Sequence, residues 1–265
     1  MRNKENSSKR FNNKQSSFRE RQNEKKSSND GLTRLNKHIA NAGICSRREA
    51  DQFIEAGVVS VNGKVVTSMG FKVSKEDVVK FNNSTIRREK EQYVLLNKPK
   101  NYITNTKDPS KQNSVIRLVE RICKEQILPI GKLDRISTGL MLFTNDSDLL
   151  KKLSSKNKRI KTIYQVSLNK SLLSKDLKNI QDRINKEKSQ SNITSVNYVE
   201  GKDKNEVGIE VTLIKSQIIY QTFEDLGYKV MKIDRVYFAG LTKKNLPRKE
   251  CRFLTKEEIT ILRRI

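Results

Sequence analysis

Residues 131–146 read GKLDRISTGLMLFTND, a stretch that decides the architecture of the C-terminal part of the chain. Gly131 and Gly139 flank a short polar loop, and the apolar run 140–143 predicts a buried strand. Loops that are held by a rigid sheet position catalytic groups well. The stretch therefore predicts a strand with a functional loop at its start.

Asp134 lies in this loop between Lys132 and Arg135. A carboxylate beside two cations is ionised near neutral pH, and it can act as a nucleophile or stabilise a sugar cation. The alternative interpretation is a turn aspartate that pairs with Arg135. Composition and spacing alone leave both interpretations open.

The segments around this loop mix strands with helices. The predicted strands cover residues 93–96, 140–143, 164–168 and 207–213. The predicted helices have apolar faces at Leu173, Leu177, Ile180 and Ile184 and, after a capping box of Thr255 and Glu258, at Ile259 and Leu262. There is no regular βαβ repetition, so we expect an α+β fold with a mixed or antiparallel sheet.

A smaller unit is predicted over residues 31–84. Leu35, Ile39 and Ala42 repeat at helical spacing before Gly43. A capping box of Ser46 and Glu49 starts a second helix, with an apolar face at Ala50, Phe53 and Ile54 and an end at Gly57. Asn62-Gly63 then predicts a tight hairpin turn. The unit is therefore two helices and a hairpin.

The helix pair of this unit brings four basic residues near one another: Arg34, Lys37, Arg47 and Arg48. They form either an RNA-binding surface or two ordinary solvated helix faces. Residues 1–30 contain few large apolar side chains and predict a disordered basic tail, which is either an RNA-contacting arm or an inert extension. The polar residues 85–91 suit a linker to the domain 92–265.

The net charge of the chain indicates which kinds of binding partner to expect. The chain has 265 residues, with 55 Lys and Arg against 30 Asp and Glu, a net charge of +25. Such an excess favours a polyanion, with nucleic acid first and an acidic membrane surface second. No apolar run of about 18 residues and no signal peptide are visible, so we expect a cytoplasmic protein. Three scattered cysteines and one histidine predict no metal site.

Two resemblances make these expectations specific. Residues 32–80, through LxxxIAxAGICSRREA and IEAGxVxVNGKVV, resemble the small RNA-binding S-four domain. GKLDRxSTGLMLFTND resembles the signature of the pseudouridine synthases that modify ribosomal RNA. LNKP at 96–99 and KTIYQV at 161–166 are similar to two further motifs of that family. The resemblance covers about residues 32–265.

The resemblance implies roles for individual residues. Asp134 falls on the catalytic aspartate of the family, and Tyr164 on the tyrosine that lies against the target base. The basic residues expected to bind RNA are Lys98, Lys132, Arg135, Lys215, Arg34, Lys37, Arg47 and Arg48. The target uridine is flipped out of its helix, because a stacked base is unreachable. The family needs no cofactor and no metal, and a monomer is expected.

This sequence also departs from the family at three places. Lys132 replaces the usual arginine, and Asn101 replaces a glycine, although asparagine tolerates left-handed backbone. The family has a segment similar to GRNRQVRRMF where this chain reads IKSQIIYQTF at 214–223. A basic residue of that segment pairs with the catalytic aspartate in the family. Here Arg135, Lys215 or Arg235 are the candidates to replace it.

The resemblance therefore predicts a pseudouridine synthase that isomerises uridine in ribosomal RNA, with the large-subunit RNA as the expected substrate. The alternative is a catalytically impaired RNA-binding protein, such as a ribosome-assembly factor that retains the synthase fold. A regulator built on an S-four domain, or a membrane-surface protein, is a third class, but it leaves the Asp134 signature unexplained.

Overall fold

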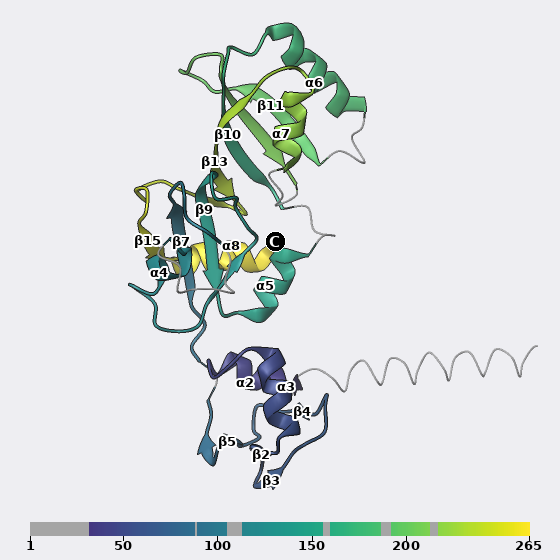
Figure 1. Ribbon diagram of the computed structural model, residues 1–265, viewed down its shortest axis with the longest axis vertical. Helices are drawn as coiled ribbons and strands as arrows, with labels where there is room; N and C mark the ends of the chain where they lie inside the picture. The colour runs from purple at the N-terminus through teal and green to yellow at the C-terminus, as the bar shows by residue number, and fades with distance from the viewer. Residues whose placement is uncertain (1–31, 88, 105–112, 156–159, 187–191, 213–216) are drawn as a thin grey trace, which may run out of the picture. The chain divides into compact units, whose positions relative to one another are not determined.

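The computed structural model describes residues 32–87, 89–104, 113–155, 160–186, 192–212 and 217–265. The chain divides into two compact units, with the boundary between Glu89 and Lys90, inside the predicted linker. The predicted tail lies outside the described residues. Figure 1 labels the helices and strands of both units.

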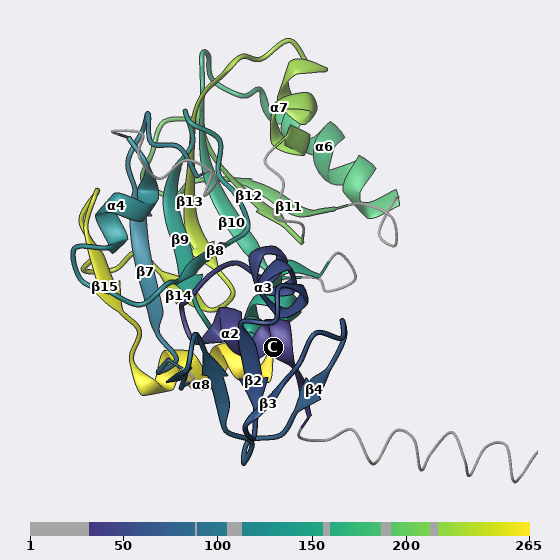
Figure 2. The same ribbon diagram turned by 60° about the horizontal axis from the view of Figure 1, so that its bottom comes forward.

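The first unit contains two helices packed on short strands. The helices are α2 (Leu35–Asn41) and α3 (Arg47–Glu55). The strand β1 (Thr33–Arg34) pairs with β4 (Lys72–Val73), and a four-stranded sheet contains β3 (Lys64–Val65), β2 (Val59–Val61), β5 (Val79–Phe81) and β6 (Ser84–Thr85). Figure 2 shows α2 and α3 beside these strands.

The capping box predicted for α3 is confirmed. The backbone N–H of Glu49 donates to the Ser46 hydroxyl at 3.3 Å, and the N–H of Ser46 donates to the Glu49 carboxylate at 2.7 Å. Asn62 and Gly63 have φ values of 51° and 81° and join β2 to β3, as a two-residue hairpin turn requires. Local sequence signals therefore determine both features.

One side chain of the predicted α3 face is not in the core. Ala50 and Ile54 are buried, whereas Phe53 is 36% exposed. The Phe53 ring contacts Phe81 edge-on, with the ring centroids 5.2 Å apart. Phe81 packs against the core of this unit, so Phe53 lies at the edge of the predicted apolar face and is only partly covered.

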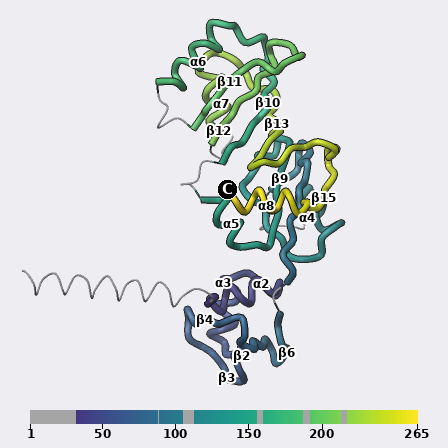
Figure 3. Tube along the Cα trace, turned by 180° about the vertical axis from the view of Figure 1, so that it is seen from behind, coloured from purple at the N-terminus to yellow at the C-terminus, as the bar shows by residue number. Residues whose placement is uncertain are grey.

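The second unit is built on one nine-stranded mixed sheet. Its strands are β11 (Ile193–Tyr198), β12 (Glu206–Val211), β10 (Thr162–Leu168), β13 (Val230–Phe238), β9 (Thr138–Thr144), β7 (Tyr93–Lys98) and β15 (Cys251–Phe253), in that spatial order. β14 (Leu241–Thr242) pairs with β13, and β8 (Leu128–Ile130) pairs with β9. In the tube of Figure 3, β13 runs between β10 and β9. The predicted α+β fold with a mixed sheet is confirmed.

Helices cover both faces of this sheet. One core contains side chains of α4 (Val115–Val119), α6 (Ser174–Lys186) and α7 (Gln217–Glu224), and the other contains those of α5 (Ser147–Ser154) and α8 (Lys256–Arg264). Alternate residues of β9 divide between the two cores, Met141 and Phe143 in one and Leu140 and Leu142 in the other. None of the helices in the described ranges is both long and apolar enough to span a lipid bilayer.

Two of the predicted helices can be compared with the structure. The capping box of Thr255 and Glu258 is confirmed at the start of α8. Helix α6 begins at Ser174, one residue after Leu173, which is 62% exposed. The apolar face predicted for this helix therefore consists of Ile180 and Ile184, with Leu177 partly buried. Leu213 of the predicted strand 207–213 lies outside the described residues.

Candidate active site

Asp134 lies on the loop between β8 and β9, at the centre of the second unit. β9 pairs with β7 on one side and with β13, in parallel, on the other. The backbone N–H of Ser137 donates to the carbonyl of Asp134 at 3.1 Å, which closes a turn. Asp134 is exposed. Its side chain is therefore accessible to a bound substrate.

Gly139 fixes the end of this loop against β13. In the parallel register Gly139 lies opposite Arg235. Gly139 has a φ of +110°, and a Cβ atom there would lie 2.3 Å from the carbonyl oxygen of Arg235 and 2.4 Å from its nitrogen. Only glycine permits this close approach. The sheet therefore determines where the loop ends.

A buried lysine fixes the rest of the loop. The Lys98 side chain is fully buried, and its ammonium lies 2.6 Å from the carbonyl oxygen of Ser137, 2.9 Å from that of Asp134 and 3.4 Å from that of Arg135. Burial lowers the pKa of Lys98 to about 8, while the charge of Asp134 opposes this shift. An RNA contact by Lys98 does not fit a side chain with no exposure. We assign it instead to positioning the loop.

The segment after β7 supports the same loop from its other side. Asn101 has a φ of +70°, and its backbone N–H donates to the carbonyl of Arg135 at 2.8 Å. The Thr104 hydroxyl donates to the carbonyl of Leu133 at 3.1 Å. Asn101, which replaces the family glycine, therefore adopts the left-handed backbone that asparagine tolerates. Two hydrogen bonds from this segment thus hold the Asp134 loop in addition to the bonds from Lys98.

Tyr164 and Arg235 form a buried polar pair beside the loop. They are directly opposite in the pairing of β10 with β13, and both side chains are fully buried. Burial raises the pKa of Tyr164, and the Arg235 guanidinium opposes this shift. The charge of Asp134 also acts on Tyr164. Tyr164, Arg235 and Asp134 are therefore close enough for their charges to influence one another.

Several polar atoms of this cluster lack partners. The Nε of Arg235 donates to the carbonyl of Leu140 at 2.6 Å. Within the described residues, no hydrogen-bond partner is present for Nη1 and Nη2 of Arg235, the hydroxyl of Tyr164 or the hydroxyl of Ser137. An unpaired buried polar group costs about 1–3 kcal/mol. A group of them side by side is typical of a site prepared for another molecule.

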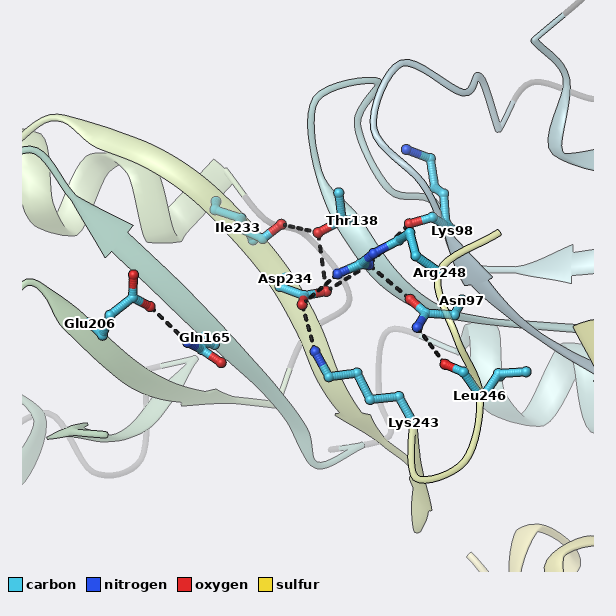
Figure 4. Close-up of polar contacts among 10 residues, drawn as sticks. All are labelled: Asn97, Lys98, Thr138, Gln165, Glu206, Ile233, Asp234, Lys243, Leu246 and Arg248. Atoms are coloured by element: carbon cyan, nitrogen blue, oxygen red, sulfur yellow. Dashed lines mark hydrogen bonds and ion pairs between the residues drawn. The ribbon is translucent and has the colours of Figure 1, made fainter. Parts of the chain in front are cut away.

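A second aspartate anchors the sheet behind this site. Figure 4 shows the Asp234 carboxylate, which accepts hydrogen bonds from Lys243 at 2.6 Å, from Arg248 at 2.9 and 3.1 Å and from the Thr138 hydroxyl at 3.1 Å. Burial alone would raise the pKa of Asp234, but the hydrogen bonds from Arg248 and Lys243 lower it to about 2. Asp234 is therefore a structural anion.

Arg248 extends this network to a third strand. Its Nη1 also lies 2.8 Å from the Asn97 side-chain oxygen and 3.2 Å from the carbonyl of Lys98, and the Asn97 amide donates to the carbonyl of Leu246 at 2.7 Å (Figure 4). The network therefore joins β7, β9 and β13 to the segment between β14 and β15. Sequence reasoning missed it, because its members come from segments far apart in the chain.

Helix α7 carries Tyr220 into the neighbourhood of Asp134. Burial raises the pKa of Tyr220; the nearby Ser137 hydroxyl opposes this shift, and the charge of Asp134 adds to it. In the ungapped comparison with GRNRQVRRMF, Tyr220 stands at an arginine of the family segment. Lys215, a predicted replacement, lies outside the described residues. A tyrosine thus occupies a position where the family has a cation.

The remaining predicted RNA-binding residues lie on the surface. Lys132 and Arg135 are exposed beside Asp134. In the first unit, Arg34, Arg47 and Arg48 are exposed and Lys37 is half-buried. Arg47 donates to Asn36 at 3.4 Å, and Asn36 donates to Asp51 at 2.9 Å, which links α2 to α3.

Comparison with known proteins now defines the class. The model of the RNA pseudouridylate synthase family matches residues 92–216, and that of the S4 domain matches residues 33–79. The chain is 32% identical to the ribosomal large subunit pseudouridine synthase B of Bacillus subtilis (strain 168), over 88% of this chain and 96% of that protein. It therefore belongs to the RNA pseudouridine synthase family.

One further relative agrees with this assignment, and one solved structure shares the fold. The chain is 33% identical to the dual-specificity RNA pseudouridine synthase RluF of Escherichia coli (strain K12), over 87% of this chain and 78% of that protein. A crystal structure of a pseudouridylate synthase superposes with a TM-score of 0.58 at 23% identity and covers 86% of this chain and 99% of that one. This likeness shows the shared fold.

Proposed function

We propose that this protein isomerises uridine to pseudouridine in ribosomal RNA, with Asp134 as the catalytic carboxylate. The observation that carries the proposal is the exposed Asp134 on a loop whose backbone is held by the buried Lys98 ammonium. Such a loop presents a carboxylate in one fixed place, as catalysis requires. The relative from Bacillus subtilis, which is named a ribosomal large subunit pseudouridine synthase, favours the same substrate here.

The reaction needs no second reactant. The bond between the sugar and N1 of uracil breaks, the base turns, and a bond forms between the sugar and C5. C5 loses its proton and N1 gains one, so that the product is an isomer of the substrate. Asp134 assists the cleavage by attacking the sugar or the base, or by aiding proton removal. The target base must first leave its stack.

Tyr164 is the residue we propose to lie against the flipped base. Its ring is fully buried in the structure. A base can reach that ring only after the side chains that cover it move. We therefore expect RNA binding to open the site around Tyr164 before the reaction begins.

The basic residues of the first unit supply affinity for structured RNA. We propose that Arg34, Lys37, Arg47 and Arg48 contact phosphates, and that Lys132, Arg135 and Lys215 contact the RNA near the target. Phosphate contacts of this kind weaken as salt rises. We further propose that the units 31–84 and 92–265, joined by the linker 85–91, act together in a cytoplasmic monomer.

The test is pseudouridine mapping of ribosomal RNA after incubation with the wild type or with Asp134→Asn. A pseudouridine made by the wild type alone supports the proposal and identifies the site. If both proteins bind the RNA and neither modifies it, the protein is an RNA-binding member of the family without turnover. A pseudouridine made equally by both would exclude Asp134 as the catalytic group.

A further inference from the structure

The guanidinium of Arg235 is held in one place. Its Nε donates to the carbonyl of Leu140 at 2.6 Å, and its central carbon lies over the ring of Phe238, 4.7 Å from the centroid. The side chain has no exposure to solvent. Two donor nitrogens, Nη1 and Nη2, are left unpaired within the described residues. A fixed, buried cation with two unused donors is costly unless another group uses them.

The neighbour on the adjacent strand is the hydroxyl of Tyr164. The two residues are directly opposite in the register of β10 and β13, so their side chains project from the same face of the sheet. The Tyr164 hydroxyl also lacks a partner within the described residues. Each group is therefore available to the other, and the charge of Arg235 already acts on Tyr164.

The chemistry of the two groups determines the direction of a bond between them. Arginine has donors and no acceptor, whereas a phenol oxygen can donate once and accept. In an Arg235–Tyr164 bond the phenol oxygen must therefore accept. Its own hydrogen then points away from the guanidinium and is available to another acceptor.

We propose that Arg235 is a positioning residue for Tyr164: its guanidinium donates to the phenol oxygen and thereby turns the O–H hydrogen of Tyr164 toward the reacting uridine beside Asp134. The two side chains are already close enough for a weak hydrogen bond between them to act on both pKa values. No bond of standard geometry joins them among the described residues, and we propose that RNA binding shortens and aligns the weak one. This inference rests on the proposed isomerisation of uridine, and it gives the buried arginine a role that acts only through Tyr164.

A double-mutant cycle tests the coupling. Single-turnover rates of pseudouridine formation are measured for the wild type, Arg235→Met, Tyr164→Phe and the double variant, with saturating protein on a ribosomal RNA fragment. We expect Arg235→Met to lower the rate roughly tenfold in the wild type, and no more than about twofold in Tyr164→Phe. Equal losses in both backgrounds would overturn the proposal, because a structural effect of Arg235 does not depend on the hydroxyl.

A matched control is the change Arg252→Met. Arg252 lies on β15 and pairs with Glu258 at 2.7 Å, away from the Asp134 loop. Its loss should change the rate by less than about twofold in either background. Arg235→Lys, which keeps a cationic donor but loses the fork geometry, should retain more activity than Arg235→Met.

A spectroscopic measurement needs no turnover and so separates this inference from the proposed function. In protein labelled with ¹³C at tyrosine Cζ, the Tyr164 resonance is assigned by its loss in Tyr164→Phe. We expect it to shift when Asp134→Asn protein binds the RNA fragment, and this shift to be absent when Arg235→Met is added and reduced when Arg235→Lys is added. A shift unaffected by either change at Arg235, or no shift in a protein that binds the RNA, contradicts the proposal.

Discussion

Asp234 lies on β13 and Asp134 on the loop that leads into the neighbouring strand β9, yet their surroundings are opposite. Asp234 is 5% exposed, and its carboxylate is bound by Lys243, Arg248 and Thr138. Asp134 is exposed, and the buried Lys98 ammonium binds the main-chain carbonyl of Asp134. Asp234 is thus held through its carboxylate, and the main chain of Asp134 is held through its carbonyl.

The difference follows from the cost of burying charge. A carboxylate in the interior must be paired and hydrogen-bonded, and its partners then neutralise its charge and occupy its oxygens. A carboxylate that acts on another molecule must keep its charge accessible, so the protein has to hold it by other atoms. The carbonyls of the Asp134 loop provide such atoms. The comparison thus separates a structural anion from a candidate catalytic one.

The largest effect is expected at Asp134. Asp134→Asn keeps the size of the side chain and all of the main-chain contacts to Lys98 and removes the charge. We expect the single-turnover rate to fall roughly 10⁴-fold or more, because the chemistry depends on that charge. The free energy of unfolding should change by less than about 0.5 kcal/mol, since the side chain is exposed. The rate is measured together with urea unfolding of the same two proteins. A large loss of stability in Asp134→Asn would show that Asp134, like Asp234, is a structural residue.

Sequence patterns predict the local features of this molecule well. Both capping boxes, at Ser46 and at Thr255, depend on residues three apart, and the Asn62-Gly63 turn depends on its own backbone preferences. The apolar run that became β9 was also visible. The loop of Asp134 was found because it directly precedes that run. Each of these features depends on residues that are close together in the sequence, so the sequence alone can predict it.

The supports of the site could not be predicted in the same way. Arg248 and Asn97 are 151 residues apart, and only the folded sheet brings them together. The family resemblance implied that Lys98 binds RNA. Its burial depends on the carbonyls of a loop some 36 residues away, which the local sequence does not reveal. The same limit applies to Arg235, whose fully buried position reflects the pairing of β13 with β9 and β10.

The second effect concerns the lysine that holds the loop. Lys98→Met keeps an unbranched side chain of similar length but removes the donor to the carbonyls of Asp134 and Ser137. We expect a loss of roughly 100-fold in single-turnover rate, because a displaced carboxylate loses its orientation. The dissociation constant for RNA should change less than about threefold, since Lys98 is buried. A larger change in binding than in rate would restore its predicted role as an RNA contact.

The pH dependence of Lys98 sharpens this prediction. Because burial lowers the pKa of Lys98 to about 8, the ammonium loses its proton in the folded protein as the pH rises through about 8. The rate should fall across this pH range, and the fall should be absent in Lys98→Met. The unfolded chain keeps the proton up to its ordinary pKa of about 10.4, so the contribution of Lys98 to stability should rise between pH 8 and 10. Rate and stability should therefore move in opposite directions.

The third effect is on stability. Asp234→Asn should lower the free energy of unfolding by about 2 kcal/mol at pH 7, because two charge-assisted pairs are lost while Lys243 and Arg248 remain about a third exposed. The folded pKa of about 2 lies below the ordinary value of 3.8, so this contribution is present above pH 4 and is lost as the pH falls toward 2. The free energy of unfolding of the wild type and of Asp234→Asn is measured between pH 2 and 7, and the difference between them should shrink as the pH falls. A constant difference across that range would contradict the ion-pair explanation.

The smallest effect is expected at Thr138, whose hydroxyl lies 3.1 Å from the Asp234 carboxylate and 3.2 Å from the carbonyl of Ile233. Thr138→Val keeps the shape and removes the donor, so we expect a loss of about 1 kcal/mol in stability. The matched control is Thr260→Val on α8, where the hydroxyl donates to the carbonyl of Lys256 on an exposed face; its loss should stay below about 0.5 kcal/mol. In the Asp234→Asn background the Thr138→Val cost should shrink, because the charged acceptor is gone. If the cost is unchanged there, the hydroxyl contributes through Ile233 instead, and Thr138 is not part of the Asp234 network.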